Sequence, residues 1–207
     1  MVDLRTRKKA ALRATIVRCA IGLFVERGYE SVVVEEIVDA AMCSRSTFNR
    51  YFGSKEDVLF PGAPEVVSGL HDALSSASAT TDRWSTARAA VTAQLRSFFD
   101  TFDPDLRVTC MRLWFTEAAP RRRYLEIAYE FEKILNGYFA AGLPDNAETL
   151  LRVQVLASAM VSALRAVLHA TIESGDDVGD LAATAFGMIE AGVPATALAS
   201  LRAAAAS

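Results

Sequence analysis

The sequence is poor in the residues that disulfide frames and metal sites require. It has three cysteines and two histidines in 207 residues. The cysteines, Cys19, Cys43 and Cys110, lie far apart, and an odd number of widely spaced cysteines fits a reducing cytosol rather than a disulfide frame. Their spacing also suits no zinc site. We therefore expect a cytoplasmic protein with no metal and no other cofactor.

Long apolar runs and helix-breaking residues are scarce as well. Charged residues interrupt every apolar stretch before it is long enough to cross a bilayer, so we expect neither a membrane span nor a signal peptide. Only 11 glycines and six prolines are present, while 52% of the residues are hydrophobic. This composition favours an all-α globular protein with a sizeable core.

Charge is distributed unevenly along the chain. Residues 1–55 hold ten Lys or Arg and six Asp or Glu, a net charge of +4, so the remaining residues carry −7 of the total of −3. A small basic head on an acidic body indicates that the head meets phosphates and the body does not.

Apolar residues recur at helical spacing along the whole chain. In the head this spacing predicts helices at 8–27, 34–41 and 45–52 and a fourth that begins at Lys55, with Ser44 and Ser54 as N-caps. Residues 61–64, Pro-Gly-Ala-Pro, are the clearest break, and we expect a kink or loop there. In the body, helices are predicted at 65–79, 83–102, 105–118, 121–141, Ala147–Ser174, Val178–Ala191 and 195–205.

Two short helices joined by a tight turn predict a helix-turn-helix at residues 33–52. Phe48 and Phe52 are four residues apart and share the face turned toward the core. The opposite face presents polar side chains that suit bases and phosphates. We expect DNA contacts from Ser44, Arg45, Ser46, Thr47, Asn49, Tyr51 and Lys55.

These side chains divide by the part of DNA that they suit. Arg45 matches guanine O6 and N7 and Asn49 matches adenine, each pair discriminating by about 1–3 kcal/mol. Tyr51 and the hydroxyl groups suit phosphate, as do Lys55 and the amides at the start of the fourth helix.

Residues 24–30 (FVERGYE), 36–41 (EIVDAA) and 44–56 (SRSTFNRYFGSKE) resemble the TetR family of repressors. The resemblance covers about residues 8–60 and is specific. It implies nine or more helices, a homodimer joined through the last long helices and a C-terminal ligand pocket. It also implies that ligand binding separates or rotates the two heads, so that they no longer fit the operator.

The head departs from the family pattern at three places. Val33 stands near a usual threonine that caps the second helix, so we expect a weaker helix start or a role for Ser31. Met42 and Cys43 replace Gly-Val in the turn. A left-handed residue other than glycine costs on the order of 1 kcal/mol, so the turn is strained or differently shaped. Asn49, often a tyrosine in the family, predicts an altered operator preference.

Aromatic side chains concentrate in the body. Such a stripe is most often plain core, and the alternative is an apolar ligand cavity. Residues 151–165 and 181–191 also resemble actinobacterial TetR regulators of the mycofactocin-system type, which implies a long-chain acyl-CoA or similar amphipathic ligand. The candidate pocket residues are Phe98, Phe102, Met111, Trp114, Phe115, Tyr124, Phe131, Met160, Leu164 and Arg165.

The last two helices suit dimerisation. Ala147–Ser174 is apolar on more than one face and therefore needs burial on several sides. Val178–Ala191 carries small residues that allow close approach. We expect a homodimer in which both helices pair with their symmetry mates, the alternative being a monomeric bundle.

Together these features predict a DNA-binding region at 8–60 and a ligand-binding and dimerisation region at 65–207. The hypothesis is a repressor that leaves a palindromic double-stranded operator when it binds a hydrophobic small molecule. One alternative is a helical enzyme acting on small molecules, for which we find no phosphate loop, metal cluster or nucleophile–base motif. The other is an architectural, sequence-tolerant DNA-binding protein.

Overall fold

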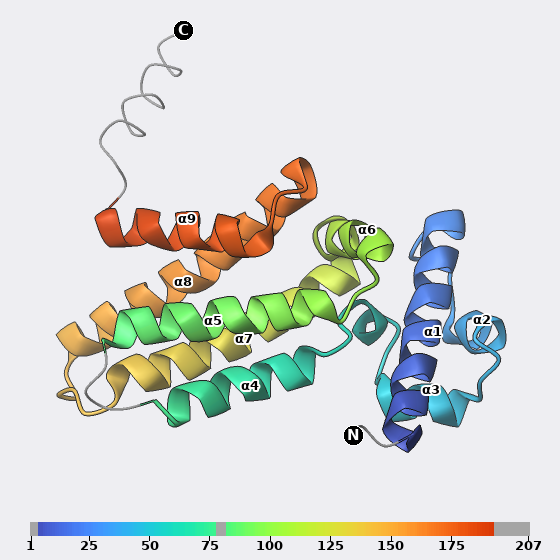
Figure 1. Cartoon of the computed structure of the whole chain (residues 1–207), viewed down its shortest axis with the longest axis horizontal. Helices are drawn as coiled ribbons and strands as arrows, with labels where there is room; N and C mark the ends of the chain where they lie inside the picture. The colour runs from blue at the N-terminus through green and yellow to red at the C-terminus, as the bar shows by residue number, and fades with distance from the viewer. Residues whose placement is uncertain (1–3, 78–81, 193–207) are drawn as a thin grey trace, which may run out of the picture. The chain divides into compact units, whose positions relative to one another are not determined.

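The computed structural model describes residues 4–77 and 82–192, and the regular structure in these ranges is entirely helical (Figure 1). The predicted all-α fold class is therefore confirmed. The elements are α1 (Leu4–Arg27), α2 (Val34–Ala40), α3 (Arg45–Tyr51), the 3-10 turn η1 (Glu56–Leu59), α4 (Ala63–Ser75), α5 (Arg83–Asp100), α6 (Pro104–Thr116), α7 (Ala118–Ala140), α8 (Ala147–Ser174) and α9 (Val178–Ala191). The helix predicted at 195–205 lies outside the described residues.

Helices α8 and α9 begin and end at the predicted residues because strong local signals fix their ends. The Asn146 side chain accepts a hydrogen bond from the Thr149 amide, and Gly175 ends α8 in the left-handed conformation. The Asp177 side chain accepts from the amides of Gly179 and Asp180 at the start of α9.

The helix starts predicted at residues 55, 65 and 121 were wrong, and proline explains the last two. No α-helix begins at Lys55, where the chain forms only the short turn η1. Helix α4 begins inside the expected break, with Pro64 in its first turn, and α7 begins at Ala118, with Pro120 in its first turn. A proline in the first turn removes only an amide that has no partner within the helix, so these prolines start helices rather than interrupt them.

The chain forms two compact units. Unit 1 comprises residues 1–67 and 97–129, and unit 2 comprises residues 68–96 and 130–207. The first unit therefore includes α6 and the first half of α7, which follow the expected break in the sequence. Helix α7 is continuous and contributes to both units.

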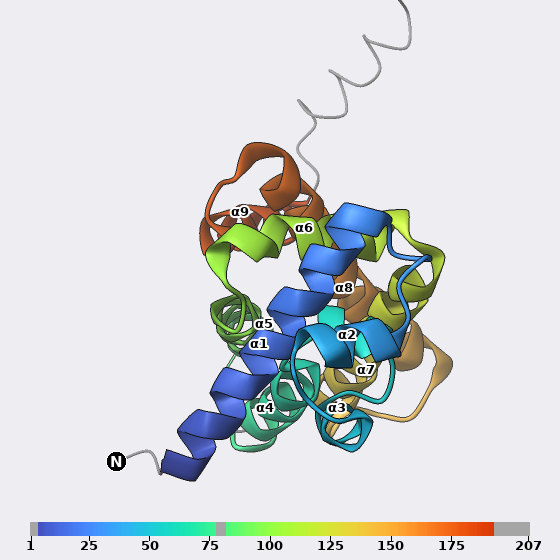
Figure 2. The same cartoon turned by 90° about the vertical axis from the view of Figure 1, so that its right-hand side faces the viewer.

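In unit 1, helices α1, α2 and α3 form a small three-helix head (Figure 2). Ile16 and Phe24 of α1, Ile37 of α2 and Phe48 of α3 are all buried, as is Phe52 after α3. The helical spacing of Phe48 and Phe52 predicted that both face the core, and their burial confirms it. The other face of α3 is left in solvent.

In unit 2, α8 packs against α9. Helix α8 is long and apolar enough to cross a membrane by length and composition. Seven of its side chains, however, are buried in the structure. Core helices of soluble proteins have this same combination of length, composition and burial.

Candidate DNA-reading head and effector cavity

The turn between α2 and α3 is left-handed at Met42, where φ is 49°. Within the described ranges, Met42 is the one residue other than glycine with a positive φ. The Cys43 amide closes the turn by donating to the Val38 carbonyl at 2.9 Å. Of the two alternatives given by the sequence, a strained or a differently shaped turn, the left-handed φ of Met42 favours strain, because methionine has a steric cost there that glycine avoids.

The two helices of the motif start in different ways. Ser44 caps α3, because its hydroxyl accepts from the Thr47 amide at 3.1 Å. Val33 precedes α2 and offers no side-chain cap. Instead, the Val33 amide donates a hydrogen bond of 3.1 Å to the carboxylate of Glu36, which lies three residues further along the chain. The helix start is therefore satisfied from within α2 and does not depend on Ser31.

The exposed face of α3 brings several of the predicted base-reading residues together. Arg45, Ser46 and Asn49 are exposed, whereas Thr47 and Tyr51 are half-buried. Arg45 forms an ion pair with Glu35 of α2, and both side chains are largely exposed. Such a surface pair is weak, so little free energy opposes the exchange of Glu35 for a base or a phosphate.

Lys55 is anchored inside the head. Its amine donates to the carbonyls of Tyr29 at 3.0 Å and Val32 at 3.1 Å. The Tyr29 hydroxyl donates to Glu56 at 2.8 Å. Burial, with the hydrogen bond and the charge of Glu56, raises the pKa of Tyr29 far above its usual value, so the phenol remains a donor. Two of the three N–H donors of the Lys55 ammonium group thus link the start of η1 to the segment between α1 and α2.

Asp57 carries a contact that the sequence analysis missed. Its Oδ2 accepts from the amides of Gly53 and Ser54, both at 3.1 Å, directly after α3. Its Oδ1 accepts from Arg123 Nε of α7 at 2.8 Å. The Ser-x-x-Asp spacing of residues 54–57 was a local signal for the first contact. Arg123 lies 66 positions along the chain, and no local pattern points to it.

The thiols of Cys43 and Cys110 are not activated. Burial raises the pKa of the Cys110 thiol to about 12. Burial, with a smaller contribution from Cys19, raises the pKa of Cys43. A raised pKa disfavours the reactive thiolate at both positions.

The predicted pocket residues separate between the two units. Phe98, Phe102, Met111, Trp114, Phe115 and Tyr124 belong to unit 1, and Phe131, Met160, Leu164 and Arg165 belong to unit 2.

In unit 1 the aromatic members of this set form a packed cluster around Trp114. Its ring lies 5.7 Å from that of Phe98, 6.1 Å from Phe102 and 6.5 Å from Tyr124. Its indole N–H donates to the Leu59 carbonyl at 3.0 Å. In unit 2, Phe131, Met160 and Leu164 are buried and Arg165 is exposed.

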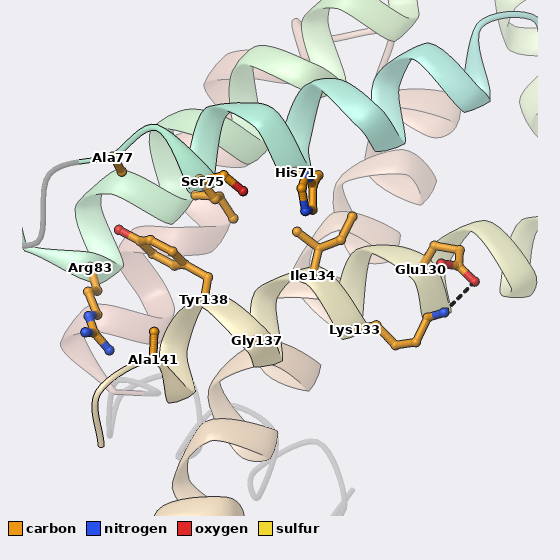
Figure 3. A pocket seen from close by; sticks show the side chains of 11 residues that line it. His71, Ser75, Ala77, Arg83, Glu130, Lys133, Ile134, Gly137, Tyr138 and Ala141 are labelled. Carbon is orange, nitrogen blue, oxygen red and sulfur yellow. Dashed lines mark ion pairs between the residues drawn. The ribbon is translucent and has the colours of Figure 1, made fainter. Parts of the chain in front are cut away.

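Unit 2 holds a cavity of about 600 Å³, and the residues that line it are not among the predicted pocket residues (Figure 3). His71 of α4 and Ile134 of α7 point toward one another across it. Arg83, at the start of α5, lies at one end. Glu130 and Lys133 form an ion pair of 2.8 Å at the other. The lining residues are His71, Leu74, Ser75, Ala77, Arg83, Glu130, Lys133, Ile134, Gly137, Tyr138 and Ala141.

Comparison with known proteins identifies the head. Residues 16–60, from α1 to the end of η1, match the model of bacterial regulatory proteins of the tetR family. The head is therefore similar to the DNA-binding region of TetR-family regulators. Over 55 residues the chain is 44% identical to the HTH-type transcriptional regulator TcmR of Streptomyces glaucescens. This similarity spans 27% of the chain and 24% of TcmR, about a quarter of each protein.

Solved structures extend the TetR likeness to the fold of nearly the whole chain. A protein of Syntrophomonas wolfei described as a TetR-family regulator superimposes with a TM-score of 0.61 at 15% identity, covering 89% of this chain and 97% of that one. The fatty acid degradation regulator FadR of Bacillus halodurans gives 0.57 at 18% identity, covering 88% and 96%. Thermus thermophilus FadR gives 0.51 at 19% identity, covering 88% and 95%.

Met42 offers a direct test of strain in this TetR head. Met42→Gly is expected to raise the free energy of unfolding by about 1 kcal/mol, because glycine adopts the left-handed conformation without a steric cost. Denaturation in urea measures the change. Met42→Ala is the control, because the Met42 side chain is 93% exposed and its loss removes little contact. Equal stability of the two variants would show that the turn is not strained.

Proposed function

We propose that this TetR-family protein is a transcriptional repressor that binds a palindromic operator as a homodimer and leaves it when a hydrophobic small molecule binds. The observation that carries the proposal is the solvent-exposed face of α3, where Arg45, Ser46 and Asn49 stand together on a TetR head. The protein acts in the cytoplasm by binding rather than by catalysis. Residues 8–60 bind DNA, and residues 65–207 bind the ligand and dimerise.

The effector site is the cavity of unit 2. Its volume of about 600 Å³ is of the size that holds a small molecule. Two regulators of similar fold support an acyl-chain effector, since one is a fatty acid degradation regulator and the other was solved with lauroyl-CoA. We therefore propose that the effector is an amphipathic molecule with an acyl chain, such as a long-chain acyl-CoA or a similar amphiphile.

The homodimer forms through α8 and α9. Both helices expose large apolar side chains in the isolated chain although they also contribute to the core. Exposed apolar side chains that gather on paired helices favour burial against a partner. These residues are Leu150, Leu151, Val155, Leu156 and Met188.

Genome-wide footprinting of the protein tests the proposal. A repressor of this kind protects a small number of palindromic sites, whose neighbouring genes then indicate the effector. Similar affinity for operator and random DNA at matched salt would instead support an architectural DNA-binding protein. Turnover of a bound small molecule would support the enzyme alternative.

Arg45→Ala is expected to lower the ratio of operator to random-DNA affinity at least about tenfold, because one bidentate base contact is worth about 1–3 kcal/mol. Fluorescence anisotropy with both duplexes measures the ratio. Glu35→Gln is the matched control, since it breaks the ion pair and leaves Arg45 in place. Equal losses on both duplexes for Arg45→Ala would contradict base reading by this residue.

A further inference from the structure

We infer that the cavity of unit 2 takes an amphipathic carboxylate, with the carboxylate group at Arg83 and an elongated apolar body along α7. The inference rests on the proposed function only in treating this ligand as the effector. The negative charge of the ligand, the end of the cavity at which that charge lies and the elongated shape of the ligand each follow from a different feature of the cavity walls.

The cavity is long, and apolar side chains line part of it between its two charged ends. Its α7 wall runs from Glu130 to Tyr138, eight steps along the helix that span about 12 Å at the helical rise, and Ala141 lines the cavity directly after α7. Leu74 and Ile134 line it, and Ile134 lies between the two ends. A single unbranched chain fits a space of this length, because the two facing helices α4 and α7 bound it on opposite sides (Figure 3).

The two ends of the cavity differ in charge. Lys133 is paired with Glu130 at 2.8 Å, so this end is close to neutral. At the other end, Arg83 Nη1 donates to the Phe139 carbonyl at 2.9 Å, which fixes the guanidinium. Within residues 4–77 and 82–192, no carboxylate forms an ion pair with Arg83.

An anionic group satisfies the Arg83 end better than a neutral one. One of the five guanidinium N–H donors is used by Phe139, so the fork still has donors to offer. Arginine and carboxylate are matched in geometry, and the hydrogen bond between them is charge-assisted. Ser75 and Tyr138 line the cavity near this end and add hydroxyl donors (Figure 3).

Gly137 shows that the cavity wall has room for a side chain. It lies on α7 and lines the cavity, and a Cβ built there meets no atom within 4 Å. Gly137→Leu therefore places a side chain in the cavity from a Cβ position that meets no neighbour. It also replaces a glycine within a helix by a residue of higher helix propensity. Loss of binding in this variant thus cannot come from unfolding of α7.

The test is calorimetry of the full-length protein with three probes of one twelve-carbon chain, namely dodecanoate, dodecanol and dodecyltrimethylammonium, each below its micelle concentration. Dodecanoate is expected to bind at least about tenfold more tightly than dodecanol, which corresponds to one charge-assisted contact of about 1.5–3 kcal/mol. The ammonium probe is expected to bind most weakly. Arg83→Gln should bring dodecanoate down to the affinity of dodecanol.

Two pairs of variants complete the design. Gly137→Leu should abolish binding of dodecanoate and dodecanol. Gly22→Leu, at another open helical glycine outside the cavity, should bind as the wild type does. Arg152→Gln is the charge control, because Arg152 is exposed on α8 and pairs with Glu148. It should leave the preference for carboxylate unchanged.

Equal binding of the three probes, binding that survives Gly137→Leu, or no binding of dodecanoate would each overturn the inference. Operator binding is measured separately by anisotropy. If dodecanoate binds as expected but the operator complex persists, the cavity chemistry stands and the effector role fails. If the operator is bound and dodecanoate is not, the inference fails while the DNA-binding function stands.

Discussion

Replacing Arg123 by alanine is expected to weaken operator binding about tenfold for each head, and so about hundredfold for a dimer, each factor of ten corresponding to about 1.4 kcal/mol. Arg123 holds Asp57 at 2.8 Å, and Asp57 in turn accepts from the amides of Gly53 and Ser54. These two amides follow directly on α3. Without Arg123, the segment that follows α3 loses one of the contacts that hold it in place. The position of α3 must then be fixed when DNA binds, and the loss of conformational freedom lowers the affinity.

Several features make this contact more than a surface ion pair. Arg123 and Asp57 are 35% and 24% exposed, less than the typical pair on this protein. The hydrogen bond to Glu126 and the charge of Asp57 raise the pKa of Arg123 despite its partial burial, so the guanidinium stays charged. Trp114 binds the Leu59 carbonyl at the other end of the same turn. The turn η1 is therefore held from α6 and from α7.

The neighbouring arginine provides the control. Arg122 is exposed, and in the described part of the chain it forms no ion pair. Arg122→Ala removes the same positive charge without touching Asp57. Arg123→Lys should restore part of the affinity, because an ammonium can still reach one carboxylate oxygen. If Arg122→Ala and Arg123→Ala weaken the operator complex equally, the effect is one of general charge and not of positioning.

Leu151→Asp is expected to convert the dimer to a monomer at micromolar concentration and to weaken operator binding at least about hundredfold, because a two-fold interface carries the substitution twice and each buried carboxylate costs several kcal/mol. Leu151 is 65% exposed on α8, and Val155, one turn further along, is 56% exposed. Analytical ultracentrifugation measures the association. The affinity follows because a single head contacts only one half-site.

Leu125→Asp is the matched control. Leu125 is also an exposed leucine, at 51%, but it lies on the part of α7 that belongs to unit 1. It should remain dimeric and bind the operator as the wild type does. A Leu151→Asp protein that still sediments as a dimer would place the interface away from this face of α8.

Local signals account for the parts of the structure that were predicted correctly. The ends of α8 and α9 follow from Asn146, Gly175 and Asp177, each of which acts within four residues of its own position. The burial of Phe48 and the cap at Ser44 follow from helical spacing and from a side chain adjacent to the turn. The predicted starts of α4 and α7 were wrong because a proline can either start a helix or break one.

The sequence by itself determined the helical class, the DNA-reading head and the position of its strained turn, because these depend on residues close together in the chain. The tertiary structure alone decided the pairing of Asp57 with Arg123, which lie 66 positions apart. It also decided where the cavity lies. Phe98, Phe102 and Tyr124, which were expected to line a ligand pocket, pack around Trp114 in unit 1. The cavity of unit 2 lies beside Gly137, between α4 and α7.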